Sequence, residues 1–395
     1  MNRGIFLVFF AAAVPLGALG LSRGSHQVGP TTFDVLPVLT DKQIKGLGFD
    51  MARYPECDAR CINDHGDIVG VITGQLTTGA YRRIAFIVRR GRLVTIEPVS
   101  GKGFEPKAIN NSDVVAGGIG DGMPRVAAAI WRNGKLTRLS NLANDPDAYS
   151  EATGINDAGT VTGWSDTSVP IRQPHAVIWT KAEGVADLGP PPARPFTPMS
   201  DGGPSGATTC GLAINAMNDI IGTGMHFFAW RPGLLWSHGK ATALGHDLKG
   251  GVSQDRTVIS GDRWDGLNPT AINDLGEIVG TRGLPGYGRN PCRWDDGKMS
   301  PLGGDGMPLA INAAGTVVGT SNFPLQYQPR FNETYPLRAL IWLDGRTSDL
   351  NGLANTNGWT LQEAVSINAR GQILCLGYRK EGTWMRLNAF VLTPR

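Results

Sequence analysis

One short pattern of apolar and polar positions recurs along the chain. An aliphatic residue is followed by Asn, two variable residues, a turn residue, and then an aliphatic run that ends in a small residue. The seven copies begin at Ile62, Ile109, Ile155, Ile214, Ile272, Ile311 and Ile367. A strand-like repeat with a period of about fifty residues is typical of propellers, solenoids and other arrays. The repeat therefore indicates the architecture before any single motif does.

The third residue after each Asn predicts a tight hairpin turn. It is always Gly, Asn or Asp, the residue types that tolerate a positive φ. The seven positions are Gly66, Asp113, Gly159, Asn218, Gly276, Gly315 and Gly371. The Asn that precedes each of them is suited to bond the backbone of its own turn.

A second hairpin follows most copies of the first. It has an apolar strand that ends in an aromatic or aliphatic residue, a polar turn with Gly, and a strand that ends in Leu. Residues 128–139 and 339–350 are examples. Two hairpins make four short strands, which is the size of one propeller blade. The sequence thus predicts an all-β fold, a seven-bladed β-propeller of four-stranded blades.

The two ends of the repeat array predict how the ring closes. The last copy stops after its third strand, at residues 389–392, and a lone strand-like segment, residues 32–38, precedes the first copy. We expect this N-terminal strand to complete the last blade, which hides two open sheet edges. Pro37 suits such an outer strand, where a missing N–H is tolerated. A single propeller domain would then span residues 31–395.

The repeat resembles the extracellular HAF-type repeat family. The shared pattern is Ala-x-x-Ile-Asn-x-x-Gly-x-Val-x-Gly, then Ala-Phe/Ile-Trp, then Gly-x-x-x-x-Leu-Gly, and residues 154–163 are among the closest copies. The resemblance covers roughly residues 55–393, although the His-Ala-Phe element survives only in part, as in His175-Ala176-Val177. It implies a secreted or surface β-propeller. The family carries no agreed catalytic residues, so the resemblance implies no activity.

Composition and charge agree with one large all-β domain. The 54 Gly and 26 Pro residues suit many turns, and 41% apolar residues are enough for a core. The net charge of +3 is small and scattered, so we expect neither a nucleic-acid partner nor a membrane surface.

Residues 252–261 resemble a degenerate first hairpin. We interpret them as a loop insertion, and the alternative is an eighth blade.

The N-terminus predicts export. Arg3, the apolar run over residues 5–16 and the small residues near position 20 form a signal peptide over residues 1–20, followed by a mature tail over residues 21–30. The apolar run is shorter than the roughly 20 residues that a membrane span needs. We therefore expect a secreted or periplasmic protein with no membrane span in the mature chain, and we expect it to be a monomer.

The five cysteines allow one candidate disulfide. Cys57 and Cys61 are close enough in sequence to pair, and an oxidising compartment permits the bond. The alternative is that Cys61 is only the small residue of the first strand, where other copies carry Ala, Gly or Ser. No Cys and His spacing indicates zinc, so we expect no metal and no cofactor.

Loop lengths predict which end of the ring is functional. Alternating antiparallel strands place the turns after Asn, and the turns after a recurrent Trp, at one end, where all are short. The connections at the other end are longer and variable, among them residues 71–83, 163–174 and 378–386. Variable loops on a rigid scaffold usually carry function. The ligand-binding candidates in or beside them are Trp164, Arg172, His175, Trp230, His246, Arg263, Trp264, Tyr287, Tyr335, Trp359, Tyr378 and Trp384.

Two functions from different classes remain open. Exposed aromatic rings suit a binding module for a glycan, a peptide or a protein, although any single ring could instead pack one loop against another. A polysaccharide-acting enzyme would need a His or Tyr base beside an Arg for a lyase, or two carboxylates for a hydrolase. Asp147 with Glu151 and Asp262 with Asp265 are such pairs. Polar loops carry such residues in any case, so binding is the preferred hypothesis and no catalytic residue is assigned.

Overall fold

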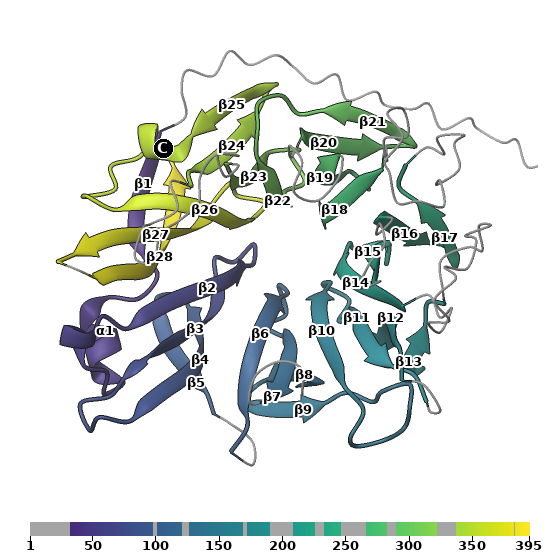
Figure 1. The fold of residues 1–395 in the computed structure, drawn as a ribbon, viewed down its shortest axis with the longest axis horizontal. Coiled ribbons are helices and arrows are strands. Elements are labelled where there is room, and N and C mark those ends of the chain that lie inside the picture. The colour runs from purple at the N-terminus through teal and green to yellow at the C-terminus, as the bar shows by residue number, and fades with distance from the viewer. Residues whose placement is uncertain are drawn as a thin grey trace, which may run out of the picture. The chain divides into compact units, whose positions relative to one another are not determined.

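Seven four-stranded antiparallel sheets surround a common centre in the computed structural model (Figure 1). The structure describes residues 32–97, 101–120, 126–168, 172–189, 208–225, 233–245, 266–282, 290–321, 337–382 and 384–395. The chain from Thr32 to Arg395 forms one unit. The predicted signal peptide and tail, and the degenerate hairpin over residues 252–261, lie outside the described residues. The seven-bladed propeller that the repeat predicts is confirmed.

The blades follow one another in chain order. Blade 1 contains β2 (Glu56–Ile62), β3 (Ile68–Gln75), β4 (Tyr81–Arg89) and β5 (Arg92–Ile96); blade 2 contains β6 (Gly103–Ile109), β7 (Val115–Gly120), β8 (Val126–Arg132) and β9 (Lys135–Arg138); blade 3 contains β10 (Ser150–Ile155), β11 (Val161–Asp166), β12 (Pro174–Thr180) and β13 (Gly184–Asp187); blade 4 contains β14 (Thr208–Ile214), β15 (Ile220–Met225), β16 (Gly233–Ser237) and β17 (Lys240–Ala243). Blade 5 contains β18 (Leu267–Ile272), β19 (Ile278–Arg282), β20 (Asn290–Asp295) and β21 (Lys298–Pro301). Blade 6 contains β22 (Met307–Ile311), β23 (Val317–Thr320), β24 (Ala339–Leu343) and β25 (Arg346–Asp349). Blade 7 contains β26 (Thr360–Ile367), β27 (Ile373–Glu381), β28 (Trp384–Pro394) and β1 (Phe33–Pro37).

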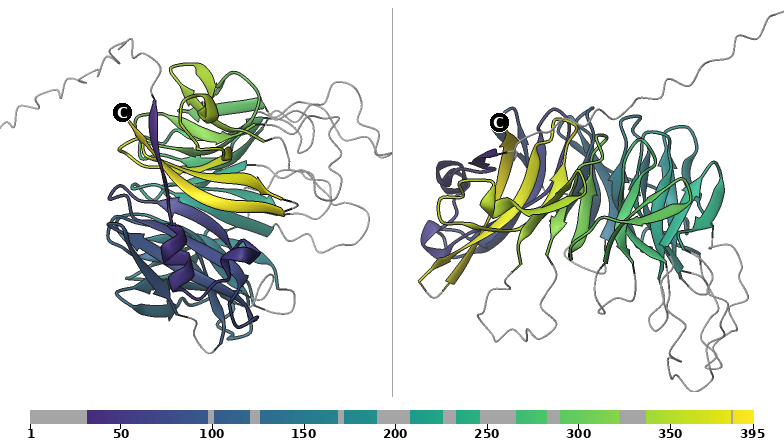
Figure 2. Two further views of the ribbon diagram at one scale, coloured as in Figure 1. Left: turned by 90° about the vertical axis from the view of Figure 1, so that its left-hand side faces the viewer. Right: turned by 90° about the horizontal axis from the view of Figure 1, so that it is seen from above.

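The N-terminal strand closes the ring as predicted. β1 pairs antiparallel with β28, with Phe33 opposite Pro394 and Pro37 opposite Phe390, and it is the outermost strand of blade 7 (Figure 2). Phe33 is only 3% exposed and packs in the core of that blade. The N-terminal and C-terminal parts of the propeller are therefore held in one sheet.

Short helices that the sequence did not predict link β1 to blade 1. They are α1 (Asp41–Gly46) and the 3₁₀ turn η1 (Met51–Arg53), and a further 3₁₀ turn, η2 (Leu350–Gly352), follows β25. Thr40 caps α1, since its hydroxyl accepts from the Gln43 N–H and the Gln43 side chain reaches back to the Thr40 N–H. In the part of the chain that the structure describes, no helix is both long enough and apolar enough to cross a membrane.

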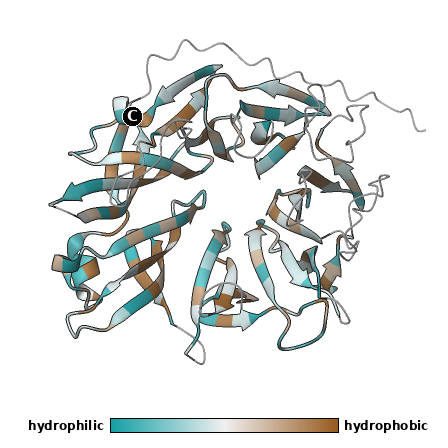
Figure 3. Cartoon of the chain, viewed as in Figure 1, coloured by the Kyte–Doolittle hydropathy of each residue, from teal (hydrophilic) through white to brown (hydrophobic). Residues whose placement is uncertain are grey.

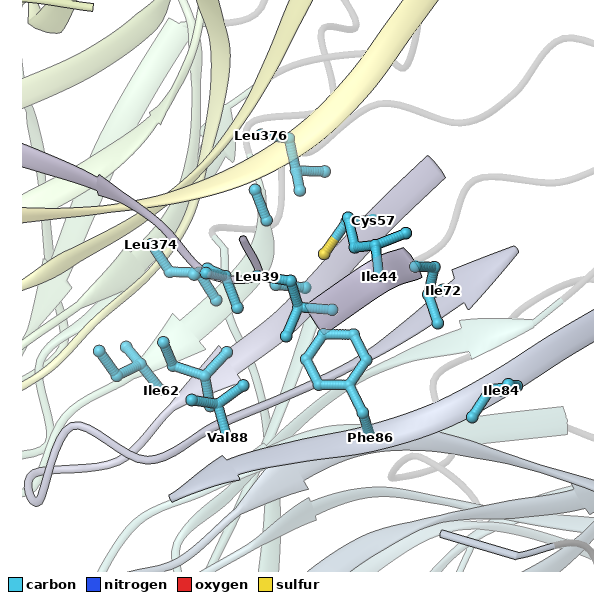
Figure 4. Packing of buried hydrophobic residues seen from close by; sticks show 14 of the residues in the cluster. Leu39, Ile44, Cys57, Ile62, Ile72, Ile84, Phe86, Val88, Leu374 and Leu376 are labelled. Carbon is cyan, nitrogen blue, oxygen red and sulfur yellow. The ribbon is translucent and has the colours of Figure 1, made fainter. Parts of the chain in front are cut away.

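The core is divided among the seams between blades. Apolar residues are spread over every blade rather than gathered at one point (Figure 3). The recurrent tryptophans are at most 9% exposed and belong to these clusters; they are Trp131, Trp179, Trp236, Trp294 and Trp342. Figure 4 shows one cluster, in which Ile44 of α1 and Phe86 of β4 pack beside Leu374 and Leu376 of β27. Each blade is thus stabilised by its neighbours.

The first strand of every blade is innermost and carries the same irregularity. These strands surround the centre in Figure 1, and each contacts the next around the ring, with β26 contacting β2. In every one, the pairing register shifts at the third residue before the Asn, as in a β-bulge. The residues at this shift are Arg60, Lys107, Thr153, Leu212, Thr270, Leu309 and Val365.

The bulge explains the small residue that closes the aliphatic run of the repeat, within the second strand of each blade. In six blades this residue is Gly, and an added Cβ would lie 1.9–2.5 Å from a carbonyl oxygen of the bulged first strand. The six are Gly70, Gly117, Gly163, Gly222, Gly280 and Gly319. Blade 7 has Cys375 there, and its first strand contains a second register shift, between Leu361 and Glu363.

Two expectations about local structure were wrong. Two connections that the sequence assigned to loops are largely strand: β3 ends at Gln75 and β4 begins at Tyr81, while β27 ends at Glu381, which pairs with Trp384 at the start of β28. The Cys57–Cys61 disulfide is also absent, since both thiols are free. Both residues lie on β2, where four residues of extended chain span about 13 Å, and a disulfide needs Cα atoms within about 7 Å.

Candidate functional site

The recurrent Asn residues form a closed ring of hydrogen bonds. The side-chain Nδ2 of each Asn donates to the backbone carbonyl of the corresponding Asn in the next blade, at 2.9–3.3 Å, and Asn368 of blade 7 donates to Asn63 of blade 1. All seven side chains are at most 7% exposed. A buried amide must satisfy its polar atoms within the protein, so this ring joins every blade to its neighbour.

The same side chains also hold their own turns. Asn110 Oδ1 accepts from the N–H groups of Ser112 and Val114, at 3.0 and 2.9 Å. The turn residue that follows has a positive φ in all seven blades, from 61° to 84°, as predicted. The repeat pattern thus predicted the local bonding of each Asn, but it gave no sign of the bond to the next blade.

A second set of contacts closes the same end of the ring. Asp64, Asn111 and Asp157, which directly follow the Asn residues, are linked because Asn111 Nδ2 donates to Asp64 Oδ2 at 3.0 Å and to Asp157 Oδ2 at 2.8 Å. Their Oδ1 atoms accept backbone N–H groups of the neighbouring blade. A cavity of about 180 Å³ lies among these residues. Its carboxylates are already engaged in joining blades, so this end is scaffold.

The opposite part of the innermost strands carries a different set of side chains. Five residues before the Asn, four adjoining blades have a carboxylate, whereas the other three have Cys210, Asn268 and Met307. We call the four carboxylates the acidic arc: Asp58 of blade 1, Glu105 of blade 2, Glu151 of blade 3 and Glu363 of blade 7. Five residues of strand place the arc about 16 Å from the Asn ring, toward the end where the sequence predicts function.

Three ion pairs hold the arc, and two of them join neighbouring blades. Arg60 pairs with Asp58, Arg83 pairs with Glu105, and Lys107 Nζ lies 3.0 Å from Glu151 Oε1. Arg60 and Lys107 are the bulge residues of their strands, and a bulge re-aims a side chain. With the nearby Glu56, five carboxylates lie beside these three cations, so the arc keeps a negative charge.

Three carboxylates of this region have raised pKa values, and burial is the main cause. Burial raises the pKa of Glu363 and of Glu56, and the neighbouring Asp58 carboxylate raises both further. Burial also raises the pKa of Asp58 even though Arg60 and Arg83 oppose the shift. The Asp58 Oδ1 atom is buried and has no hydrogen-bond partner among the described residues. Such an atom suits a donor supplied by a ligand.

Two of the predicted binding residues lie in or beside this region. Burial, and then the carboxylates of Glu363, Glu56 and Asp58, raise the pKa of Tyr378 to about 12, so Tyr378 is close to the arc. Trp164 stands opposite Glu151 in the pairing of β10 with β11. The structure thus brings Tyr378 and Trp164 to the arc from blades 7 and 3.

Trp359, which directly precedes β26, has contacts of its own. The Arg379 and Arg386 guanidinium carbons lie 4.7 and 5.7 Å from the centre of its ring, and the Phe390 ring packs edge-on at 5.1 Å. Cations over an aromatic face occupy the surface that a sugar would stack on. Trp359 therefore packs the blade, which was the alternative that the sequence left open for any single ring.

Two further candidates are held in separate ion pairs of blade 3. His175 Nδ1 lies 2.8 Å from Asp187 Oδ2, and Arg172 pairs with Asp145. The histidine lowers the pKa of Asp187 against the effect of burial. These two residues do not form the base and arginine pair that a lyase would need.

The remaining predictions cannot be placed on the described fold. Trp230, His246, Arg263, Trp264, Tyr287 and Tyr335 lie outside the described residues, as does the Asp262 and Asp265 pair, and only the backbone of Trp384 is described. Sequence reasoning considered Glu151 only as the partner of Asp147 and missed the rest of the arc. The sequence did contain a signal for the arc, because each of the four carboxylates stands five residues before the recurrent Asn of its repeat.

Known proteins show only a distant likeness to this chain. No family model matches the chain, and no curated protein is similar to it in sequence. The β-propeller domain of the Trilobed protease from Pyrococcus furiosus is similar in structure, with a TM-score of 0.49 and 10% identity over 87% of this chain and 98% of that chain. The Pyrococcus horikoshii acylaminoacyl peptidase has a TM-score of 0.46 and 11% identity over 85% of this chain.

These similarities concern the fold alone. The match spans about half of the acylaminoacyl peptidase, 52% of its length. A protein of unknown function from Bacteroides thetaiotaomicron also matches, with a TM-score of 0.38 and 10% identity over 87% of this chain and 70% of that chain. Function therefore has to be argued from this chain's own residues, and membership of the HAF-type repeat family stays a prediction.

Proposed function

We propose that this protein is a binding module that holds a basic peptide segment of a partner protein at the acidic arc. The observation that carries the proposal is that carboxylates outnumber the paired cations at the arc, while the buried Asp58 Oδ1 atom has no hydrogen-bond donor among the described residues. A Lys or Arg side chain would supply both a positive charge and hydrogen-bond donors.

A peptide fits this site better than a glycan does. Sugars stack on flat aromatic rings, and the ring of Trp359 is covered by Arg379 and Arg386. Trp164 and Tyr378 remain beside the arc, but the main feature of the site is its carboxylates, which attract a basic side chain. Arginine and lysine side chains are long enough to reach carboxylates set below a rim. Four carboxylates on four adjoining blades would allow several basic side chains of one extended segment to bind together.

Binding of synthetic peptides by the mature protein, without residues 1–20, tests the proposal. Fluorescence anisotropy would compare Lys- and Arg-rich peptides with acidic and neutral peptides of equal length. We expect the basic peptides to bind, and we expect binding to weaken at least tenfold, which is about 1.4 kcal/mol, in the D58N/E363Q double variant.

An exposed carboxylate at the other end of the ring provides the matched control. Asp344 is an exposed turn residue with a φ of 50°, a conformation that Asn also tolerates. Asp344→Asn removes one negative charge without touching the arc, so it should leave peptide affinity unchanged. Equal affinity of the parent and the D58N/E363Q variant, or a preference for acidic peptides, would exclude the arc as the binding site.

A polysaccharide hydrolase is the second candidate function. It is favoured by the raised pKa of Glu363 beside the Asp58 carboxylate, because a proton donor and a carboxylate are what glycoside hydrolysis requires. Incubation with neutral and acidic polysaccharides, with new chain ends counted over time, would detect it. Cleavage that Glu363→Gln abolishes would support the enzyme, and cleavage that this variant retains would exclude Glu363 as the acid.

We further propose that the protein acts outside the cytoplasm, after removal of residues 1–20. The support is the charged start, the apolar run and the small residues of the N-terminal sequence. N-terminal sequencing of protein recovered from an exporting host would test this. A mature chain that starts near residue 21 is expected, and an intact Met1 in the recovered protein would contradict export.

A further inference from the structure

Three possible metal ligands meet at the seam between blades 1 and 2, at the Asn end of the ring and away from the acidic arc. His65 and Asp67 lie in the turn that joins β2 to β3, and Asp113 lies in the turn that joins β6 to β7. One ligand atom from each lies within 4.8 Å of the others. The three residues approach one another only because the ring of Asn residues brings these two turns together.

Protein contacts use only part of this group. The Asp67 carboxylate is 3% exposed, and its Oδ1 accepts from the Arg90 N–H at 3.1 Å. The Asp113 Oδ2 faces Arg89 Nη2 at 3.0 Å, whereas its Oδ1 is buried and has no hydrogen-bond partner among the described residues. The group therefore contains an orphaned carboxylate oxygen beside a second carboxylate and an imidazole.

The charges of the group also favour a bound cation. The carboxylates of Asp67 and Asp113 lie close together, and the guanidinium of Arg89 faces Asp113. Two carboxylates against one guanidinium leave a net negative charge when both are ionised. A cation between the carboxylates would remove their repulsion and satisfy the buried Asp113 oxygen.

We propose that His65, Asp67 and Asp113 bind one divalent transition-metal ion, for which Zn²⁺ is the fitting probe. Imidazole and carboxylate ligands bind zinc at about 2.0–2.2 Å, so ligand atoms of one ion are at most about 4.4 Å apart. Small side-chain adjustments therefore suffice to bring the three atoms onto an ion. Ca²⁺ and Mg²⁺ prefer all-oxygen ligands, so the imidazole selects against them.

The repeat makes this seam unique among the seven. The position of His65, two residues after the Asn, holds Ser112, Ala158, Met217, Leu275, Ala314 and Arg370 in the other blades. The position of Asp113, three residues after the Asn, is Gly or Asn everywhere else. An imidazole and a turn carboxylate thus meet only where blade 1 adjoins blade 2.

The spacing of Cys and His residues along the sequence did not indicate this site. The expectation of no metal came from that spacing alone. His65 and Asp67 are close in the chain, but Asp113 belongs to the next repeat. A metal ion here would link blade 1 to blade 2, and an ion that binds only the folded protein stabilises it by mass action. The site would therefore affect stability and would leave peptide binding at the arc unchanged.

Isothermal titration of tag-free, chelator-treated protein with Zn²⁺ tests the proposal. We expect one ion per chain, and a rise in melting temperature when zinc is added. His65→Gln and Asp113→Asn should each weaken zinc binding at least about tenfold, the lower range for disturbing a metal site. His65 is exposed, so its replacement leaves the core intact.

A second exposed histidine provides the control. His238 lies in the turn that follows β16, with a φ of 50° that Asn can adopt, and its Nδ1 lies 2.8 Å from the Ser237 hydroxyl. His238→Asn should bind zinc like the parent. Parent-like zinc binding by both the His65 and Asp113 variants, no zinc binding at all, or equal binding of Ca²⁺ would overturn the proposal.

Discussion

At the scale of single residues, one Asn per repeat has two structural roles. Its side-chain oxygen fixes a tight turn, and its side-chain nitrogen bonds the next blade, as Asn110 does to the carbonyl of Asn156 at 2.9 Å. The first role depends on neighbours in sequence and could be predicted. The second joins blades whose residues are far apart in the chain, such as Asn368 and Asn63, and could not.

Replacing Asn110 by Asp isolates the second role. The carboxylate can still accept from the Ser112 and Val114 N–H groups, but it cannot donate to Asn156. The buried carbonyl then loses its partner, which costs about 1–3 kcal/mol of unfolding free energy. Urea denaturation of Asn110→Asp measures this. Asn133→Asp, at an exposed turn position with a φ of 49°, is the control and should be neutral.

The glycines beside the bulges give a second residue-scale prediction. A Cβ at Gly163 would lie 1.9 Å from the Glu151 carbonyl oxygen, which belongs to the backbone and cannot rotate away. Gly163→Ala should therefore destabilise by about 3 kcal/mol, the upper range for overpacking. Gly352→Ala, where an added Cβ meets nothing within 4 Å, should be nearly neutral. Equal melting temperatures for the two variants would contradict the role of the bulge.

At the scale of elements, the position of β1 was the least obvious part of the fold. The sequence nevertheless predicted it. The last repeat lacked a fourth strand, and one unassigned strand preceded the first repeat. Counting strands therefore placed β1 in blade 7. The helix α1 was not predicted, because its six residues are too short to show helical periodicity. The connections over residues 71–83 and 378–386 were misjudged because β3 and β27 continue past the small residue that closes the repeat pattern.

Deleting residues 31–38 tests the closure. The deletion removes Phe33 from the core of blade 7 and exposes the edge of β28. Loss of a buried Phe alone costs about 3–5 kcal/mol, so we expect the melting temperature to fall sharply and aggregation to rise. A chain that lacks only residues 1–30 should melt like the mature protein. An unchanged melt after deletion of 31–38 would mean that β1 does not close the ring.

At the scale of the whole molecule, the two ends of the ring differ in how they use carboxylates. At the Asn end, Asp64 and Asp157 accept hydrogen bonds that join blades. In the acidic arc, carboxylates of four adjoining blades stand at one position of the repeat, and Asp58 keeps a buried oxygen without a partner among the described residues, as Asp113 and Asp219 do at the Asn end. From loop lengths the sequence predicts that function lies at the end of the ring that holds the arc, and this stays a prediction. The arc itself is formed by four blades and became apparent only from the fold.

The arc predicts a dependence of stability on pH. The folded protein holds protons on Glu56, Asp58 and Glu363 at higher pH than the unfolded chain does, because their pKa values are raised. Between the unfolded and folded pKa values the folded state binds more protons. Stability should therefore fall as pH rises above the ordinary pKa values of 3.8 for Asp and 4.5 for Glu.

Melting temperatures from about pH 4.5 to 7.5 measure this contribution, since the window starts near the ordinary carboxyl pKa values. The D58N/E363Q variant lacks two of the three groups, so its stability should decline less toward neutral pH than that of the parent. Asp344→Asn should keep the parent profile. A steeper decline in the double variant would show that ionisation stabilises the arc carboxylates in the folded protein, which is the opposite of what their raised pKa values predict.

The central claim is that ligands bind at the acidic arc rather than at the Asn end. Photo-crosslinking of a Lys- and Arg-rich peptide to the mature protein, followed by mass spectrometry of the linked fragments, tests it most directly. We expect crosslinks in residues 56–60 and 360–363, at the arc ends of β2 and β26. Crosslinks confined to the turns after the Asn residues, such as residues 63–67 and 110–114, would contradict this claim.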